Sequence, residues 1–185
     1  ARPSETLRTL DGIDRVLDTD MLMICDASRP VAVAGVMGGE STEVSSDTRS
    51  ILLESASFHR GSVRATSRKL GLATEASYRF ERQVDAAGVV RALDRACELL
   101  AQIGAGTPAP GVVDVDNRGE AAIPRELTLN PDFCRMLLGM EIEPEQMAES
   151  LRRLQFDAEL RDGLVWCQVP SWRSDVTMEH DLVEE

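Results

Sequence analysis

The chain has 185 residues, of which 43% are hydrophobic, and a formal net charge of −12. This composition supports a packed core, and the apolar runs are too short for a membrane-spanning helix. The acidic balance argues against a protein that wraps nucleic acid by charge alone. The four cysteines stand apart without a C-x-x-C motif and only two histidines are present, so we expect free, buried, reduced thiols rather than a zinc site.

The first half of the chain predicts short strands followed by two helices. Residues 6–18 fit a hairpin that turns at Asp11-Gly12, and 21–28, 30–37 and 51–58 fit strands. Residues 40–50 are polar and loop-like. Residues 59–71 fit a helix ended by Gly71. Residues 85–104 fit a second helix, with a predicted core stripe formed by Val89, Leu93, Cys97 and Leu100.

The second half predicts a small helix-and-hairpin module. After a Gly- and Pro-rich stretch with an expected strand at 112–115, residues 125–130 fit another strand. Asn130-Pro131 predicts the start of a helix that Gly139 ends, and Pro144 opens the next helix. Residues 156–170 fit a hairpin that turns at Asp162-Gly163. We therefore predict an α+β chain with two domains, 1–117 and 118–185, the second winged-helix-like.

Charge is distributed unevenly along the chain. Residues 118–185 carry 7 basic and 15 acidic side chains, whereas a local basic stretch occupies 60–82. Its members are Arg60, Arg64, Arg68, Lys69, Arg79 and Arg82. The stretch is either a solvated helix face or a contact surface for an anionic partner.

Two features in the first half indicate a binding site. The run "AVAGVMGGE" begins like a strand and then contains Gly35, Gly38 and Gly39. It has neither the glycine spacing nor the following helix of a nucleotide-binding loop. The glycines therefore form either a tight turn or a close approach of the backbone to a ligand. Glu54 interrupts the apolar run "ILLESASF" and either points outward or lies in a pocket, where it could accept a hydrogen bond from a ligand hydroxyl. Thr74, Ser77 and Tyr78 offer further hydroxyl groups.

The last thirteen residues, "RSDVTMEHDLVEE", concentrate carboxylates. Asp181, Glu184 and Glu185 share one side of an expected helix, and Asp175 lies just upstream. Such oxygen donors suit Mg²⁺. The alternative is that acidic residues simply favour a helix N-terminus.

Four segments in order carry a resemblance to a known family. They are "AVAGVMGGESTEVSSDTRSILLESASF", "SRKLGLATEASYRFERQVD", "LTLNPDFCRMLLGMEI" and "VPSWRSDVTMEHDLVEE". Together they resemble the bacterial phenylalanyl-tRNA synthetase beta subunit. The resemblance covers the later part of its editing module, here 1–117, and most of the small domain that follows, here 118–185. The chain does not begin with Met and ends in what looks like the start of a helix, so we expect a fragment.

The resemblance implies roles for individual residues. The editing pocket would comprise Gly35, Gly38, Glu54, Thr74 and Ala76, with Glu54 recognising the hydroxyl of mischarged tyrosine. Arg60, Arg64, Arg68 and Lys69 would contact tRNA, and Asp175, Asp181, Glu184 and Glu185 would bind Mg²⁺. The family's editing pocket also has a histidine upstream of these motifs, so this chain is expected to hold an incomplete site.

The resemblance also implies a function and partners. The chain would belong to a cytoplasmic, ATP-dependent phenylalanine–tRNA ligase with an α₂β₂ assembly. It would hydrolyse Tyr-tRNA(Phe) and contact the tRNA acceptor end and the alpha subunit, without a membrane. The amino-acid activation site is expected to lie outside this sequence. The alternative is a non-catalytic RNA-binding or subunit-docking scaffold.

Overall fold

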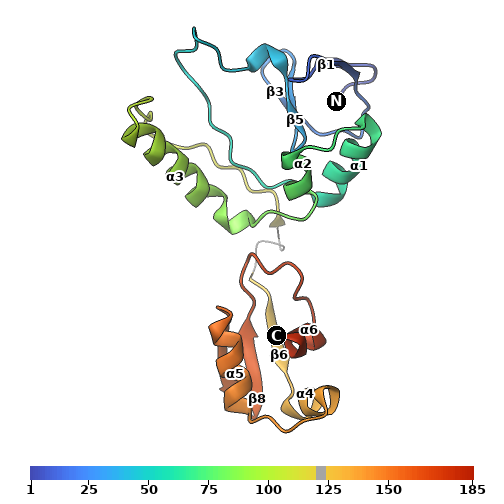
Figure 1. Cartoon of the computed structure of the whole chain (residues 1–185), viewed down its shortest axis with the longest axis vertical. Helices are drawn as coiled ribbons and strands as arrows, with labels where there is room; N and C mark the ends of the chain where they lie inside the picture. Colours follow the sequence, from blue (N-terminus) through green and yellow to red (C-terminus); the bar gives the residue numbers. More distant parts are fainter. Residues whose placement is uncertain (120–123) are drawn as a thin grey trace. The chain divides into compact units, whose positions relative to one another are not determined.

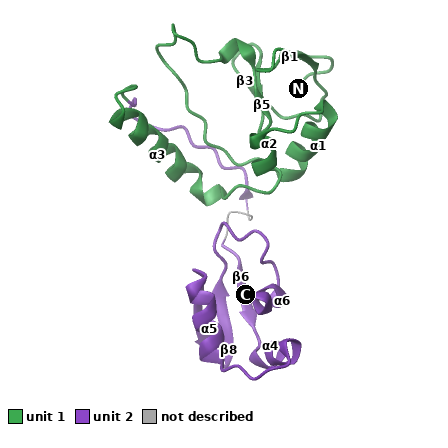
Figure 2. Cartoon of the chain, in the orientation of Figure 1, with its two compact units in different colours: residues 1–107 green, residues 108–185 purple. Residues whose placement is uncertain are grey.

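The computed structural model describes residues 1–119 and 124–185. The chain separates into two compact units, residues 1–107 and 108–185 (Figure 2). The predicted division between 117 and 118 falls in exposed coil of the second unit. No helix in the described residues is long and apolar enough to span a membrane.

Unit 1 combines two small antiparallel sheets with three helices (Figure 1). One sheet is the β1–β2 hairpin, and the other has the order β3-β4-β5. The 3₁₀ turns are Glu40–Thr42 and Ala86–Gly88. The strands and helices are β1 (Thr6–Arg8), β2 (Asp14–Val16), β3 (Met23–Cys25), β4 (Pro30–Val33), β5 (Met37–Gly38), α1 (Arg60–Leu70), α2 (Glu75–Phe80) and α3 (Val89–Gln102).

The core of unit 1 lies between the strands and α1. Its buried residues include Leu7, Val33, Val36 and Val63, with Phe58 and Phe80 packed against them. The hairpin, the β3–β4 pair and the helix ending at Gly71 are confirmed. Gly71 adopts a φ of 64°, which glycine tolerates without a Cβ penalty.

Two predictions in unit 1 are wrong. Residues 51–58 form no strand, and Leu52 is 98% exposed. An alternating sequence gives only the tendency to be extended, whereas a strand needs a partner in register, and no strand in the described residues pairs with this segment. The stripe of Val89, Leu93, Cys97 and Leu100 on α3 is half-buried rather than core, because α3 makes its main contacts with the adjoining 3₁₀ turn at Ala86–Gly88 and not with a sheet.

Unit 2 is an antiparallel sheet with the order β6-β8-β7 and three helices. The helix α5 packs on β7 and β8, α6 packs on β6, and α4 packs on α6. The core contains Leu129, Leu151, Val165 and Cys167. The elements are β6 (Glu126–Leu129), α4 (Pro131–Leu138), α5 (Pro144–Arg153), β7 (Asp157–Arg161), β8 (Leu164–Gln168) and α6 (Glu179–Glu184).

The structure confirms the α+β class and the local signals of unit 2. Asn130 caps α4 by accepting a hydrogen bond from the Asp132 amide, and Gly139 ends the helix at a φ of 68°. Asp162 and Gly163 both have positive φ between β7 and β8, as a tight hairpin turn requires. The strand predicted at 112–115 is wrong: these residues are exposed coil, and no strand in the described residues pairs with them.

The thiols are free but differ in exposure. Cys134 and Cys167 are buried, Cys97 is half-buried and Cys25 is exposed. Burial raises the pKa of Cys167 to about 11, so this thiol stays protonated and serves as an apolar core group.

Candidate functional site

The three glycines occupy different places around the β4–β5 hairpin: Gly35 lies in its turn, Gly38 in β5, and Gly39 just after β5. Gly35 has a φ of 68°, and a Cβ there would lie 3.0 Å from both Phe58 Cδ2 and Val63 Cγ2. A Cβ on Gly38 would approach Leu10 Cδ1 at 3.1 Å, and one on Gly39 would lie 2.5 Å from the Val31 carbonyl oxygen. The tight turn that the sequence offered as one alternative is confirmed at Gly35, which is a left-handed turn residue packed against core side chains; the approach of this backbone to a ligand stays a prediction.

Thr74 connects this turn to α2. Its hydroxyl donates to the Val36 carbonyl oxygen at 2.7 Å and accepts from the Ser77 amide at 3.0 Å. The Ser77 hydroxyl in turn accepts from the Thr74 amide at 2.9 Å, which completes a capping box. The structure thus brings the β4–β5 turn, at Val36, next to Thr74, with half-buried Ala76 in the first turn of the helix.

We expect Thr74→Val to destabilise unit 1 by about 2 kcal/mol, because it removes the helix cap and leaves the Val36 carbonyl without its donor. Peptide-resolved hydrogen exchange in unit 1 measures this loss. Thr74→Ser is the matched control, since it keeps the hydroxyl and should retain most of the stability. Equal losses in the two variants would contradict the role assigned to the hydroxyl.

Glu54 lies at the surface, which agrees with the outward alternative drawn from its alternation. Neighbouring atoms still desolvate its carboxyl group enough to raise its pKa. The segment around it is attached to residues near α3 by side chains: the Ser55 hydroxyl donates to the Val89 carbonyl oxygen at 2.8 Å. Within the described ranges no hydrogen bond or ion pair joins Glu54 to Gly35, Gly38, Thr74 or Ala76.

The basic stretch divides into two kinds of side chain. Arg60, Arg64 and Arg68 are exposed along α1 at four-residue spacing, and none of them forms an ion pair in the part of the chain that the structure describes. Lys69 instead pairs with Asp18, and with Asp20 at 3.3 Å. The three arginines therefore keep their charge available to an anionic partner, whereas the charge of Lys69 is largely neutralised within the chain.

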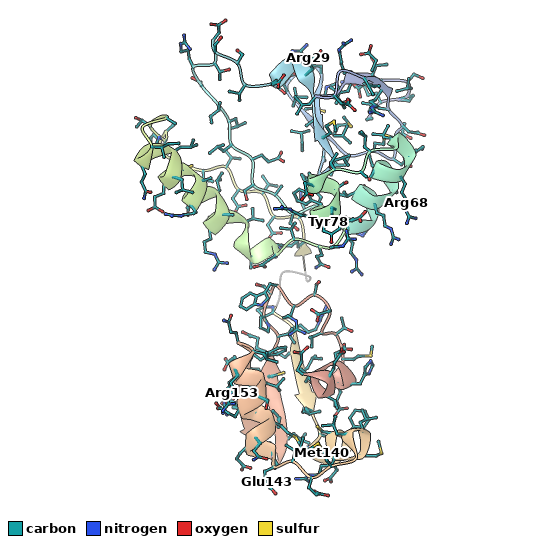
Figure 3. All side chains as sticks on the ribbon, in the orientation of Figure 1. Arg29, Arg68, Tyr78, Met140, Glu143 and Arg153 are labelled. Carbon is teal, nitrogen blue, oxygen red and sulfur yellow. The ribbon has the colours of Figure 1, made fainter. Side chains whose placement is uncertain are left out.

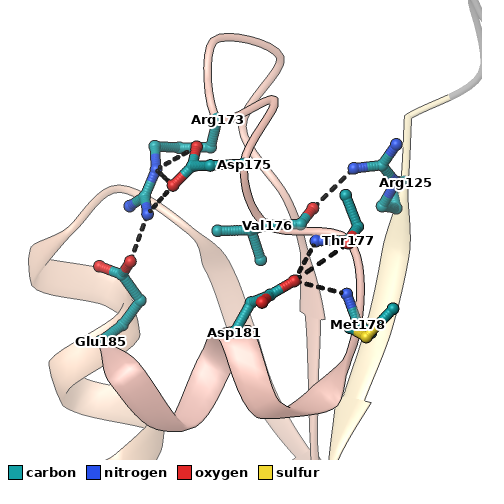
Figure 4. A network of polar contacts seen from close by, with 8 residues as sticks. All are labelled: Arg125, Arg173, Asp175, Val176, Thr177, Met178, Asp181 and Glu185. Atoms are coloured by element: carbon teal, nitrogen blue, oxygen red, sulfur yellow. Dashed lines mark hydrogen bonds and ion pairs between the residues drawn. The ribbon is translucent and has the colours of Figure 1, made fainter.

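The acidic motif is organised around Arg173 (Figure 4). The Arg173 Nε donates to both carboxylate oxygens of Asp175, at 3.0 and 3.1 Å, and its Nη2 donates to Asp175 at 2.6 Å and also to Glu185. The guanidinium carbon also lies 5.5 Å from the ring centre of Phe156. This arrangement holds the pKa of Asp175 below its usual range.

Asp181 has a different role at the start of α6. Its Oδ2 accepts from the amides of Thr177 and Met178, at 2.7 and 3.0 Å, and these bonds lower its pKa. Glu184 is exposed. The four residues have the oxygen donors that suit Mg²⁺, but among the described residues no three His, Cys, Asp or Glu side chains gather as a metal site. As arranged here, Asp175 and Glu185 fit Arg173, and Asp181 fits the amides of Thr177 and Met178 just before α6, rather than a cation.

The residue patterns did not predict two groups that hold the candidate sites together, the Arg173 guanidinium and the Val36 carbonyl. Arg173 lies two residues before Asp175 in the motif "WRSD", a spacing that allows a local ion pair. Its second partner, Glu185, directly follows α6, and this contact could be found only from the three-dimensional structure.

In the comparison with known proteins, two parts of the chain match two different domain families. Residues 1–105 match the B3/4 domain family, and residues 127–185 match the tRNA synthetase B5 domain. The chain therefore belongs to the B3/4 domain family and carries a B5 domain after it.

Over its whole length the chain is similar to curated phenylalanine–tRNA ligase beta subunits. It is 48% identical to that of Moorella thermoacetica over 185 residues, which is 100% of this chain and 23% of the relative. It is 47% identical to that of Salinibacter ruber over 177 residues, or 96% of this chain and 21% of the relative. The chain thus spans less than a quarter of the length of these relatives.

Proposed function

We propose that this chain is the later part of the editing module and the following small domain of a phenylalanine–tRNA ligase beta subunit. It acts in proofreading, where tyrosine mistakenly attached to tRNA(Phe) is hydrolysed. Similarity to the beta subunits along the whole chain carries this proposal. ATP-dependent aminoacylation in the cytoplasm is proposed for the whole enzyme, with an alpha subunit as partner in an α₂β₂ assembly.

The proposed site checks the identity of the amino acid a second time, after its attachment to tRNA. Tyrosine differs from phenylalanine by one hydroxyl, and an apolar pocket rejects an added hydroxyl by only about 10²-fold. In the proposed site the bound substrate covers the Glu54 carboxylate, which accepts a hydrogen bond from that hydroxyl. Phenylalanine in the same place leaves the covered carboxylate unpaired, at a cost of about 1–3 kcal/mol. The mischarged ester is thereby held for hydrolysis while the correct one is released.

The remaining pocket residues position the aminoacyl end of the tRNA. The turn from Gly35 to Gly38 and the N-terminus of α2 at Thr74 and Ala76 are proposed to contact it. The hydrogen bond from Thr74 to the Val36 carbonyl supports treating them as one site. The described residues offer a carboxylate and hydroxyls at this site, but among them no histidine-activated serine or cysteine. We therefore assign the attack on the ester carbon to a positioned water molecule.

Deacylation tests this assignment directly. Tyr-tRNA(Phe) and Phe-tRNA(Phe) are incubated with this chain and, in parallel, with the complete alpha–beta enzyme. We expect Glu54→Ala to slow loss of the tyrosyl ester by roughly 10- to 100-fold and to leave the phenylalanyl ester unaffected. The matched control is Glu43→Ala, which removes an exposed glutamate from the preceding polar loop.

Either of two results would contradict the proposal. An unchanged preference for the tyrosyl ester in Glu54→Ala would remove Glu54 from recognition. Absence of deacylation in the complete enzyme would remove editing altogether. Activity of the complete enzyme without activity of this chain would show that the pocket also needs residues outside it.

Mg²⁺ binding by Asp175, Asp181, Glu184 and Glu185 remains part of the proposal with one requirement. Arg173 must release Asp175 and Glu185 before their oxygens can reach a cation. No step of ester hydrolysis is assigned to the metal.

A scaffold role for unit 2 is the second candidate function, and one surface favours it. Met136, Leu137 and Met140, at the end of α4 and just beyond it, are 68%, 51% and 57% exposed. Apolar side chains grouped on a small domain are typical of a contact with another subunit. Loss of alpha–beta assembly after Met136→Glu and Met140→Glu, with unit 2 still folded, tests this role.

A further inference from the structure

Tyr78 is the one tyrosine of the sequence, and it lies on α2. The Arg82 guanidinium carbon lies 3.6 Å from the centre of the ring and covers one face. The residue is nevertheless 56% exposed. Since one face is covered and more than half of the residue remains accessible, the other face is available to a planar group.

Arg82 is itself held in place. Its Nη1 donates to the Tyr78 carbonyl oxygen at 2.8 Å and pairs with Glu81 at 2.7 Å. These two contacts and the Tyr78 ring hold the guanidinium in place before any ligand arrives. A preformed aromatic surface loses little conformational entropy on binding, which favours stacking there.

The helix that packs against α2 supplies positive charge. α1 contacts α2 and carries Arg60, Arg64 and Arg68 on its exposed face, without ion pairs in the described ranges. Figure 3 shows Arg68 on α1 and Tyr78 on α2, two helices of unit 1 that contact each other. Exposed cations on one helix and an exposed aromatic ring on the helix that packs against it are the combination by which proteins bind single-stranded nucleic acid.

We propose that the open face of Tyr78 stacks on a base of the unpaired 3′ end of tRNA, while Arg60, Arg64 and Arg68 contact the neighbouring phosphates. This inference rests on the proposed function, since Thr74 and Ala76 at the start of the same helix are assigned to the aminoacyl end. Tyr78 lies four residues after Thr74, and its amide donates to the Thr74 carbonyl oxygen at 2.9 Å, so the two side chains share one side of the helix about 6 Å apart along its axis. A nucleotide next to the terminal one is therefore within reach of the ring.

Binding of tRNA(Phe) by wild type, Tyr78→Ala and Tyr78→Phe, measured by fluorescence anisotropy over a range of KCl concentrations, tests the proposal. A second tRNA that lacks its four unpaired 3′ nucleotides serves as matched ligand. We expect Tyr78→Ala to weaken binding of intact tRNA roughly 5- to 100-fold with an unchanged salt slope, and Tyr78→Phe to bind normally. The truncated tRNA should not distinguish the three proteins.

Arg64→Gln separates the stacking from the phosphate contacts. This variant should reduce the magnitude of the logarithmic salt slope by about 0.7 to 0.9 with either tRNA. Arg153→Gln is its control, because Arg153 is an exposed arginine of unit 2 that pairs with Glu149. If neither tRNA binds the wild-type protein, the proposed function itself fails.

Three results would overturn the stacking role alone. They are normal binding of intact tRNA by Tyr78→Ala, an equal loss for intact and truncated tRNA, and protection of Tyr78 by the alpha subunit but not by tRNA. Nitration with tetranitromethane provides the last readout, since Tyr78 is the only tyrosine that can react. Intact tRNA should protect Tyr78 from nitration and truncated tRNA should not.

Discussion

Gly35→Ala should destabilise unit 1 by about 3 kcal/mol, a large part of the stability of a small domain. The φ of 68° costs an L-residue about 1–2 kcal/mol, and the new methyl group also meets Phe58 and Val63 at 3.0 Å. The Phe80 ring, whose Cγ would lie 3.2 Å away, closes the site on a further side. The surrounding core side chains must move, so an overpacking penalty adds to the backbone strain.

Gly71→Ala is the control that isolates the packing contribution. Gly71 has a similar φ of 64°, but a Cβ there would meet nothing within 4 Å. We therefore expect a loss of only about 1 kcal/mol. Hydrogen exchange in unit 1 compares the two variants. Trp166 and Trp172 both lie in unit 2, so tryptophan fluorescence should report an unchanged midpoint for that unit. Equal losses at Gly35 and Gly71 would contradict the close packing.

Arg173→Met should destabilise unit 2 by about 2 kcal/mol. The Arg173 and Glu185 side chains are only 22% and 16% exposed, so the substitution leaves the Glu185 carboxylate partly desolvated and near Asp175 without a counter-charge. The expected loss is below that for a fully buried pair, because Asp175 is 64% exposed and solvent screens it. Urea unfolding followed by tryptophan fluorescence measures this loss. Arg153→Met, which breaks an exposed pair with Glu149 at 3.3 Å, should cost less than about 0.5 kcal/mol.

The same variant should change the acid dependence of unit 2. Arg173 lowers the pKa of Asp175 in the folded state, so the stabilisation is present above the unfolded pKa of about 3.9 and is lost as pH falls through the folded pKa. Arg173→Met should therefore lose less stability than wild type below about pH 4. The stability of both proteins should still depend on pH through Asp181, because the amides of Thr177 and Met178, and not Arg173, lower its pKa. Parallel pH curves for the two proteins would contradict the ion pair.

The proposed Mg²⁺ site gives a further readout of this variant. Removing Arg173 frees the oxygens of Asp175 and Glu185, so added Mg²⁺ should stabilise Arg173→Met more than wild type. A cation effect of the same size in both proteins would show that Arg173 does not compete with the metal.

Much of the candidate site could be predicted as residue types but not as an arrangement. The glycine run, Glu54 and the hydroxyls of the Thr74 segment were found from the sequence, because their chemistry is unusual for their local pattern. The hydrogen bond from Thr74 to Val36 spans 38 residues, and nothing local indicates it. Arg173 was missed for the same reason, since its contact with Glu185 depends on the folding of α6 against the sheet.

The sequence by itself determined the elements whose boundaries depend on neighbouring residues. These boundaries depend on caps and φ angles within a few residues, so neighbouring residues are enough to predict them. The examples are Asn130 with Pro131, Gly71, Gly139 and the Asp162-Gly163 turn. Only the tertiary structure decided what residues 51–58, the face of α3 and Gly35 do. A ladder, a buried face and a close backbone approach each require a second surface brought from elsewhere in the chain, and periodicity does not specify that surface.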